Sequence, residues 1–389
     1  QMQNKRLLSL DILRGITIAG MIMVNNPGSW GSIYAPLKHA AWNGLTPTDL
    51  VFPFFMFIMG VSMYISYSKF GFKFSASTFT KLLRRSVVLF AIGLFLNWFG
   101  LTCRGMSALR DSDMNWFLRL WDAGFLHLEN WRIMGVLQRL ALVSFGGSLI
   151  LLIVNQKLIP WLIGIILFGY SALMIGTNSL ELSVDNLAAR VDLAILGDSH
   201  MYHISGIALD PEGWVSTIPC IAHVLIGVMA GALIMGVKDN HQKIERLSLL
   251  GAVILMLGFL WDYAMPINKT LWSSSYVLVT CGLASLLLAV LIWLIDVKGY
   301  KAWTRFFETF GVNPMAIFVF AGLFANLISN IGFTTAAGKW VSLKGYLYAD
   351  ILSPIFGPTL GSLVFALMFI GFCWLVALPL YKKKIYIKI

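Results

Sequence analysis

The chain has few charged residues for its length, and this scarcity excludes most soluble architectures. Only 12% of its 389 residues are Asp, Glu, Lys or Arg, whereas 58% are hydrophobic. The mean hydropathy is +0.78. A soluble domain carries about 25% charged residues. The composition is therefore typical of a protein that crosses a membrane several times. The sequence contains no stretch with a soluble domain's composition, no low-complexity tract and no convincing internal repeat.

Cysteine is also scarce, and the four cysteines are scattered along the chain: Cys103, Cys220, Cys281 and Cys373. Neither a disulfide framework nor a metal-binding spacing can be argued from them, so we expect no metal. A cleavable signal peptide is not evident either. The first apolar stretch contains Asp11 and Arg14 and lacks a small-residue cleavage site, which predicts a retained helix.

Long apolar stretches are what the sequence has instead. No water in the bilayer core can satisfy a bare backbone, so spanning segments are helices of about 20 mostly apolar residues. The sequence therefore predicts an all-α fold, a polytopic membrane protein with about ten transmembrane helices in one domain over residues 1–389. We expect the helices near residues 8–29, 47–68, 82–100, 133–154, 158–176, 214–236, 247–265, 272–295, 309–331 and 359–381.

The net charge of +11 is distributed unevenly across these helices. When Lys and Arg are assigned to alternate sides, without Arg14 and Arg139 inside the spans, 18 fall on the side of both termini and 9 on the other. The positive-inside rule then puts both termini in the cytoplasm. The basic charge is thus a topology signal rather than a sign of nucleic-acid binding. It would also suit anionic lipid or a phosphate-bearing cytosolic ligand.

The most informative segment, residues 38–53, lies on the opposite, outer side. It holds His39, Asn43 and Asp49 at the mouth of the second span. Histidine changes its charge near neutral pH, so His39 is the natural general base of a site there. The alternative for His39 is a solvated surface residue. The alternative for Asp49 is an acid that suits the helix dipole, with Thr46 or Thr48 as the cap.

Two further polar groups lie in the first span. Asp11 and Arg14 are three residues apart, so they share a helix face and are expected to pair, with Arg14 snorkelling to the headgroups. Asn25 and Asn26 end the span on the outer side. They are expected to cap the helix, and the functional alternative is an amide that donates a hydrogen bond to a reacting carbonyl.

Gln138 and Arg139 lie about one or two turns inside the outer edge of the fourth span. An arginine at that depth needs a partner, and Asp49 and Asp262 are the acids expected nearby. We therefore predict a buried Arg139–carboxylate pair that borders the site. The alternative is an arginine that snorkels to the surface.

Three other features are expected to be structural. Asp210 with the following proline predicts the start of the sixth span. His223 lies nearer mid-span and is expected to be a satisfied core histidine. Asn313–Pro314 interrupts the ninth span about a turn inside its cytoplasmic end, where proline frees a carbonyl and kinks the helix.

The polar residues map together to the outer half: Asn25, His39, Asn43, Asp49, Arg139, Asp210, Asp262 and Ser273. This clustering predicts a site between helices that opens to the outer face, bordered by a partly folded loop over residues 177–213. Trp42 lies near an outer span end. It suits an interfacial aromatic belt and also stacking on a sugar.

With these residues in view, the chain resembles the heparan-α-glucosaminide N-acetyltransferase family and its bacterial homologues, within the transmembrane acyltransferase superfamily. The stretches that carry the resemblance follow the family's order along nearly the whole chain: LDILRG (10–15), VN (24–25), KHAAWNGLT (38–46), DLVFP (49–53), GVLQRL (135–140), DPEG (210–213), LWS (271–273) and DVKG (296–299).

The resemblance implies a single transmembrane acyltransferase domain over residues 1–389, with cytosolic acetyl-CoA as the acetyl donor and an amino-sugar acceptor on the far side. The family's active-site histidine falls on His39 and its paired asparagine on Asn25, or on Asn26, because the spacing to His39 is slightly longer here. Basic residues would hold the CoA phosphates, with Arg14, Arg84 and Arg85 as candidates. A homodimer is also implied. The family's animal members have an extra N-terminal segment, so we expect a bacterial cytoplasmic membrane with His39 facing the periplasm.

The hypothesis is acetyl transfer in which His39 deprotonates the acceptor, Asn25 stabilises the oxyanion, and Asp49 or Asn43 orients His39. Arg139, with Gln138, Trp42 and Asp262, would bind the acceptor. In an alternative mechanism His39 is the nucleophile and carries the acetyl group. Two alternative functions stay open. One is O-acylation of surface-polysaccharide or cell-wall sugars, and the other is secondary transport, which ten spans and a proline-broken helix also fit.

Overall fold

Helices form nearly all the regular structure of the computed structural model, which describes residues 7–336 and 338–387. The α-helices are α1 (Leu8–Asn25), α2 (Val51–Ser68), α3 (Ala76–Ala108), α4 (Trp116–Trp121), α5 (Val136–Ile153), α6 (Ile159–Gly176), α7 (Leu187–Leu196), α8 (Thr217–Met235), α9 (Asn240–Asp262), α10 (Ser274–Leu291), α11 (Thr304–Gly311), α12 (Pro314–Asn330), α13 (Leu343–Gly345), α14 (Ser353–Phe356) and α15 (Pro358–Lys382). Two short antiparallel hairpins pair β1 (His203–Ile204) with β2 (Ile207–Ala208) and β3 (Gly332–Thr334) with β4 (Trp340–Ser342).

The predicted all-α membrane fold is confirmed. Within the described ranges, nine helices are long and apolar enough to cross a membrane, and the bent pair α11–α12 makes a tenth if it is one span. All ten coincide with predicted segments. The third is longer than the predicted 82–100, because α3 has 33 residues. At 1.5 Å per residue it is about 50 Å long, well beyond the roughly 30 Å of a hydrocarbon core. Lys5, Arg6 and Lys388, which count toward the predicted inner side, lie outside the described residues.

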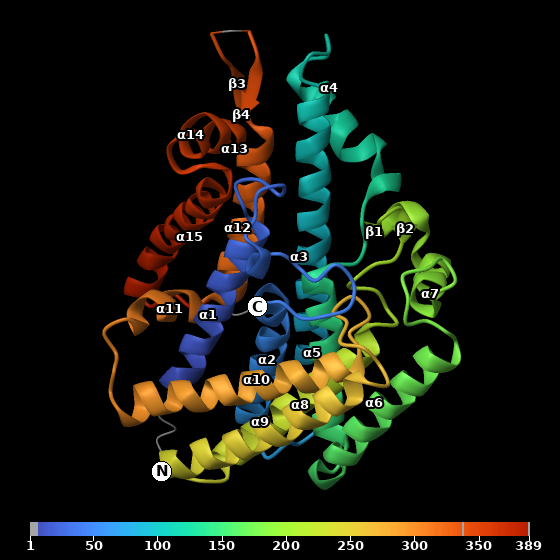
Figure 1. Ribbon diagram of the computed structural model, residues 1–389, viewed down its shortest axis with the longest axis vertical. Helices are drawn as coiled ribbons and strands as arrows, with labels where there is room; N and C mark the ends of the chain where they lie inside the picture. The colour runs from blue at the N-terminus through green and yellow to red at the C-terminus, as the bar shows by residue number, and fades with distance from the viewer. Residues whose placement is uncertain (1–6, 337, 388–389) are drawn as a thin grey trace.

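The helices pack side by side around a shared core. In Figure 1, α9 and α10 run side by side across the lower part, while α3 stands upright and carries α4 toward the top, beside the β3–β4 hairpin. The outward face of α6 is apolar: Trp161, Ile165 and Phe168, three and four residues apart, are at least 67% exposed. Residues at this spacing share one helix face. An exposed apolar face of this kind is suited to contact with lipid chains.

Glycines bring α2 and α8 into close contact. A Cβ atom at Gly60 would lie 2.1 Å from the Val224 carbonyl oxygen, and one at Gly227 would lie 2.3 Å from the Phe57 carbonyl oxygen. Small residues let transmembrane helices approach this closely. The contact matters for the site, because residues 47–50 lead directly into α2 and α8 follows the loop that ends at residue 216.

The predicted interruption of the ninth span is also confirmed. α11 and α12 meet at an angle of 86° at Asn313–Pro314. The polar groups freed by the break find partners. Arg14 donates to the Gly311 carbonyl over 3.3 Å. Asn313 donates to the Ile385 carbonyl and accepts from the Ile387 amide, each over 2.8 Å. The tail after α15 therefore folds back onto the break.

The expected Asp11–Arg14 pair is present, with 3.1 Å between Arg14 Nη1 and Asp11 Oδ1. Arg14 also donates to the Ser62 hydroxyl over 2.8 Å. The predicted helix start at Asp210 is wrong. α8 begins at Thr217, because the Asp210 carboxylate binds an arginine and nearby backbone amides instead of capping the helix.

We expect Gly60→Ala to destabilise the protein by about 1–3 kcal/mol, because overpacking at the α2–α8 contact forces the helices apart. Thermal unfolding in detergent measures the change. Gly164→Ala, in α6 with nothing within 4 Å of the added Cβ, is the matched control and should leave the Tm unchanged or raise it. An equal effect of both substitutions would contradict the packing argument.

Candidate active site

The site is built around the carboxylate of Asp49, in the 3-10 turn Pro47–Leu50 before α2. Thr46 and Asp49 form a capping box, so Thr46 is the cap, one of the two threonines that the sequence suggested. Asp49 Oδ2 accepts from the Ala40 amide at 3.1 Å, the Thr46 amide at 3.1 Å and the Thr46 hydroxyl at 2.9 Å. Asp49 is only 1% exposed. The loop of residues 38–46, called the His39 loop below, is thereby wrapped around one carboxylate.

The other oxygen of this carboxylate faces His39. Asp49 Oδ1 lies 2.6 Å from His39 Nδ1, a contact in which Nδ1 carries the proton and donates to the carboxylate. The lone pair of a neutral imidazole is then on Nε2. The Tyr276 hydroxyl in the first turn of α10 donates to the Asp49 carbonyl over 2.6 Å. The backbone of Asp49 is therefore fixed together with its side chain.

A lysine that the sequence analysis did not single out completes the cluster. Lys269 Nζ lies 3.0 Å from His39 Nδ1, 3.4 Å from Nε2 and 3.7 Å from Asp49 Oδ1. Burial lowers the pKa of Lys269 below its ordinary value, although the charges of Asp49 and Glu212 act in the opposite direction. An imidazole, a carboxylate and an ammonium thus meet at one point.

The segment that carries this lysine, residues 263–273, is called the Lys269 loop. The Asp262 carboxylate accepts from the Ile267 amide over 2.6 Å. The Ile267 carbonyl accepts from the Gly44 amide over 2.8 Å. Asn268 donates to the Asn43 side chain over 3.1 Å. Gly44 and Asn43 therefore join the His39 loop to the Lys269 loop, and Asp262 holds Ile267 in place. Of Asp49 and Asn43, the two residues predicted to orient His39, Asp49 is the one that contacts it.

The predicted Arg139–carboxylate pair is wrong. Arg139 is fully buried in α5, but its partners are the Gly213 carbonyl at 3.2 Å and the Ser216 hydroxyl. Its guanidinium also lies 5.2 Å from the centre of the Trp272 ring. No carboxylate among the described residues lies within ion-pair distance of it. Both hydrogen bonds come from Nη2, and the Trp272 ring adds a cation–π contact. Within the described residues, the buried Nε and Nη1 of Arg139 have no hydrogen-bond partner.

A second buried charge cluster anchors the loop that precedes α8. Arg132 donates to both oxygens of Asp210, at 3.0 and 2.6 Å, and to Glu212 at 2.6 Å. Burial alone would raise the pKa of Asp210, but the hydrogen bonds and charge of Arg132 lower it below its ordinary value. In the same region burial raises the pKa of Asp192 to about 6. The sequence had suggested a capping role for Asp210 and a place in the polar cluster, but not its pairing with Arg132.

The remaining predicted residues make no hydrogen bond to the His39 side chain within the described part of the chain. Trp42 donates to the Leu180 carbonyl over 3.0 Å, and Gln138 donates to the Ile133 carbonyl over 2.8 Å. Asn25 is exposed at the last position of α1, and Asn26 is the helix cap, as expected for this pair of asparagines. Arg84 and Arg85 are exposed on α3. His223 is fully buried and bonded to the Pro53 carbonyl at 2.8 Å, which confirms it as a core histidine.

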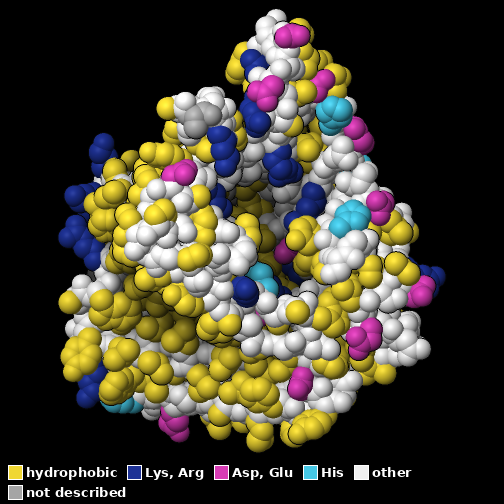
Figure 2. Space-filling model, turned by 45° about the horizontal axis from the view of Figure 1, so that its top comes forward, with side chains coloured by type: hydrophobic (Ala, Val, Ile, Leu, Met, Phe, Trp, Pro, Cys, Tyr) yellow, Lys and Arg dark blue, Asp and Glu magenta, His cyan; other side chains and the backbone are white. Residues whose placement is uncertain are grey.

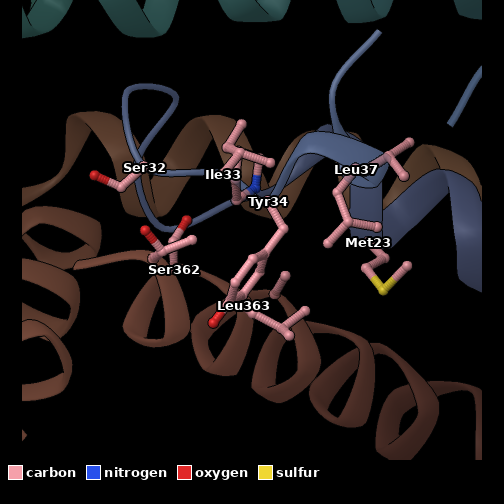
Figure 3. Close-up of a pocket in the computed structure, with 11 residues that line it drawn as sticks. Met23, Ser32, Ile33, Tyr34, Leu37, Ser362 and Leu363 are labelled. Carbon is pink, nitrogen blue, oxygen red and sulfur yellow. The ribbon is translucent and has the colours of Figure 1, made fainter. Parts of the chain in front are cut away.

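The structure has two concave features. Figure 2 shows a hollow in the middle of one face, with Lys and Arg side chains around it. A separate pocket lies between the segment after α1 and the start of α15, and Tyr34 and Met23 point into it (Figure 3). Its lining is apolar apart from a few hydroxyl groups, and none of the charged groups around His39 lines it. In the described ranges no group of three His, Cys, Asp or Glu side chains could hold a metal ion.

Sequence reasoning missed Lys269, Arg132 and Glu212 as members of these clusters. Lys269 contacts a histidine 230 positions away, and no periodicity links such distant loops. The nearest signals were its outer position in the topology and the LWS stretch two residues later. Arg132 was counted only as an outer positive charge.

Comparison with known proteins gives a consistent family. Residues 6–267 match the family described as "Heparan-alpha-glucosaminide N-acetyltransferase, catalytic". The human protein named Heparan-alpha-glucosaminide N-acetyltransferase is 30% identical over 381 residues, which cover 82% of this chain and 53% of the human protein. The mouse protein of the same name is 28% identical over 446 residues, covering 99% of this chain and 60% of the mouse protein. The chain therefore spans between about half and three fifths of the length of these curated relatives.

We expect Arg132→Met to cost about 3 kcal/mol, the lower end for a broken buried pair, because the arginine side chain is 30% exposed. Above about pH 4 the carboxylates are charged and need the arginine. As the pH falls through the lowered pKa of Asp210, the pair's contribution is lost, so the difference from wild type should shrink. Thermal unfolding in detergent between pH 3 and pH 8 measures this.

Arg110→Met is the control, because the Arg110–Asp111 pair is exposed and is worth less than about 1 kcal/mol. If Arg132→Met were no more destabilising than Arg110→Met, or if its effect did not depend on pH, the buried pair would not be what anchors this loop.

Proposed function

This chain belongs to the heparan-alpha-glucosaminide N-acetyltransferase catalytic family, and we propose that it is a membrane-embedded acetyltransferase. It would move acetyl from cytosolic acetyl-CoA to an amino-sugar acceptor on the non-cytoplasmic side. The observation that carries the proposal is the 2.6 Å contact between His39 and the buried Asp49 at the mouth of a span. The family match, which includes both residues, supports it.

The geometry around His39 suits a general base. Asp49 accepts from Nδ1, so Nε2 holds the lone pair that would take the proton from the acceptor amine. A neutral amine nitrogen loses one proton as it becomes an amide nitrogen, so a base that takes this proton is required for transfer. His39 is 46% exposed on its side chain, which allows an acceptor to reach it from the outer side.

Asn25 is the candidate for stabilising the oxyanion. Its side chain is exposed and makes no hydrogen bond within the described part of the chain, so its amide is available to donate to a carbonyl oxygen that gains charge. Asn26, by contrast, donates to the Ile22 carbonyl over 2.8 Å and is buried. Of the two asparagines left open by the sequence, Asn25 is therefore the better candidate. The alternative with an acetyl group carried on His39 stays open.

The sidedness of the reaction follows from the charge distribution. Both termini would be cytoplasmic and His39 periplasmic, in a bacterial inner membrane. Arg84 and Arg85 are exposed on the first half of α3 and are available for the phosphates of CoA. Arg14 is a weaker candidate, because Asp11, Ser62 and the Gly311 carbonyl already bind it. We retain the homodimer and the possible O-acylation of surface sugars as predictions.

One observation favours the transporter alternative. The 86° break between α11 and α12 is the kind of discontinuity that secondary transporters use at substrate sites. The polar groups of this break are bonded to Arg14 and to the chain after α15, and the charged groups gather around His39 instead. The acetyltransferase is therefore the better-supported function.

We expect His39→Ala to reduce acetyl transfer by at least about 100-fold, the low end of what a general base contributes. The assay supplies labelled acetyl-CoA and a glucosaminide acceptor to purified protein in liposomes. The matched control is His203→Ala, because His203 also contacts an aspartate, Asp198 at 3.2 Å, but in an exposed hairpin. A fully active His39→Ala protein would exclude both mechanisms. Accumulation of substrate in vesicles without acetyl-CoA would favour transport.

We expect Asp49→Asn to lower kcat by about 100-fold or more while the protein still binds acetyl-CoA, because an amide no longer fixes the proton on Nδ1 of His39. Steady-state kinetics measure kcat. The Tm reports the accompanying weakening of the Thr46–Asp49 capping box, about 1 kcal/mol. Asp198→Asn is the control for a histidine–aspartate contact without a catalytic role. A kcat close to that of wild type would show that Asp49 acts only as a cap.

A further inference from the structure

We propose that Lys269 is a positioning residue that controls the protonation of His39. Its ammonium lies over the imidazole and disfavours the imidazolium, so that His39 stands in its neutral form when the acceptor arrives. The purpose of this arrangement rests on the proposed acetyl transfer, but the effect of the lysine on His39 can be measured without any turnover.

The distances define how the lysine meets the ring. Lys269 Nζ is 3.0 Å from Nδ1 and 3.4 Å from Nε2 of His39. The two nitrogens flank Cε1, and a position in the plane of the ring at these distances would collide with that carbon. The ammonium therefore lies over a face of the imidazole and leaves the Nε2 lone pair free in the ring plane.

This position is fixed by the fold rather than by chance contact of a long side chain. The Lys269 side chain is only 23% exposed. Asn268, the residue before it, is held by three hydrogen bonds. Its side chain accepts from the Leu271 amide over 2.9 Å and donates to Asn43, and its backbone amide donates to the Ser273 hydroxyl over 2.9 Å. The loop closes at Trp272, which has a φ of +52°, a strained conformation for a bulky residue.

Two opposite charges act on His39 directly. The Asp49 carboxylate at Nδ1 favours the imidazolium, which has no lone pair and cannot act as a base. The Lys269 ammonium opposes it. Lys38, next to His39 in the chain, is exposed, while Glu212 and Arg139 act on Lys269 itself. Lys269 thus opposes the protonation of His39 that the orienting carboxylate of Asp49 favours.

The same charge helps His39 to release the proton. As the acceptor nitrogen forms its bond to the acetyl carbon and the carbon–sulfur bond breaks, His39 takes the proton from the amine. The CoA sulfur leaves as a thiolate and needs a proton. An imidazolium beside an ammonium gives its proton to that thiolate more readily, so the reaction ends with a neutral amide, a thiol and a neutral His39.

The test measures His39 protonation by its reaction with diethyl pyrocarbonate, which modifies neutral imidazole but not imidazolium. The rate of modification of the His39 peptide is followed by mass spectrometry between pH 5 and pH 8.5, on the full chain in detergent. We expect the pH midpoint in Lys269→Met to rise by at least about one unit, the low end for a neighbouring charge. Lys269→Gln should give the same shift if Lys269→Met does not fold.

Two controls separate charge from structure. Lys269→Arg keeps the positive charge and should keep the wild-type midpoint. Lys38→Met removes a lysine adjacent to His39 that is exposed, and should also leave the midpoint unchanged. An unchanged midpoint in Lys269→Met, or in Lys269→Gln, would overturn the proposal and make Lys269 a structural residue.

Acetyl transfer is then measured on the same variants. If the proposal is right, the acid limb of the pH–rate profile of Lys269→Met moves to higher pH together with the modification midpoint. A shifted midpoint in a protein whose wild type transfers no acetyl would refute the proposed function but not the effect of Lys269 on His39. Normal transfer with unshifted profiles would refute the role of Lys269 alone.

Discussion

The buried carboxylate of Asp49 is the interaction on which the candidate site depends. A carboxylate removed from water is tolerated only when donors surround it, and Asp49 recruits its donors from both ends of the His39 loop. The first turn of α10 adds Tyr276, which binds the Asp49 carbonyl. Two loops and the start of two helices therefore converge on one charge. The side chain that would work on substrate, His39, is held by this same charge.

The membrane explains why such a cluster forms at the end of the spans. Within the hydrocarbon core every backbone group must be satisfied internally, so helices leave little room for irregular segments there. The chain becomes irregular where the spans end, and there irregular loops can present side chains to one another. The close α2–α8 contact fixes the helices beneath the His39 loop. The packed spans supply the stability of the fold, and the polar loops carry the residues of the candidate site.

The sequence predicted the fold well and the site only in part, for physical reasons. The length of an apolar stretch is enough to locate a span. Asn313–Pro314 predicted the break in the ninth span, because proline cannot donate a backbone hydrogen bond. His39 and Asp49 could be named because both lie in one short loop. Lys269 could not be paired with them, since only the folded chain brings the two loops together. The Arg139 prediction failed because depth in the membrane identifies possible carboxylates but not the carbonyl, hydroxyl and aromatic partners that were used.

The break between α11 and α12 also imposes an order on biogenesis. Asn313 completes its hydrogen bonds with the backbone of Ile385 and Ile387, about 70 residues further along the chain. A ribosome therefore makes the broken span well before it makes these two partners of the Asn313 side chain, although Arg14, which binds the Gly311 carbonyl, is already present. Until the chain after α15 has been made, the Asn313 amide needs other partners, such as water or lipid headgroups. The segment after α15 thus completes the hydrogen bonding of a break that forms much earlier in synthesis.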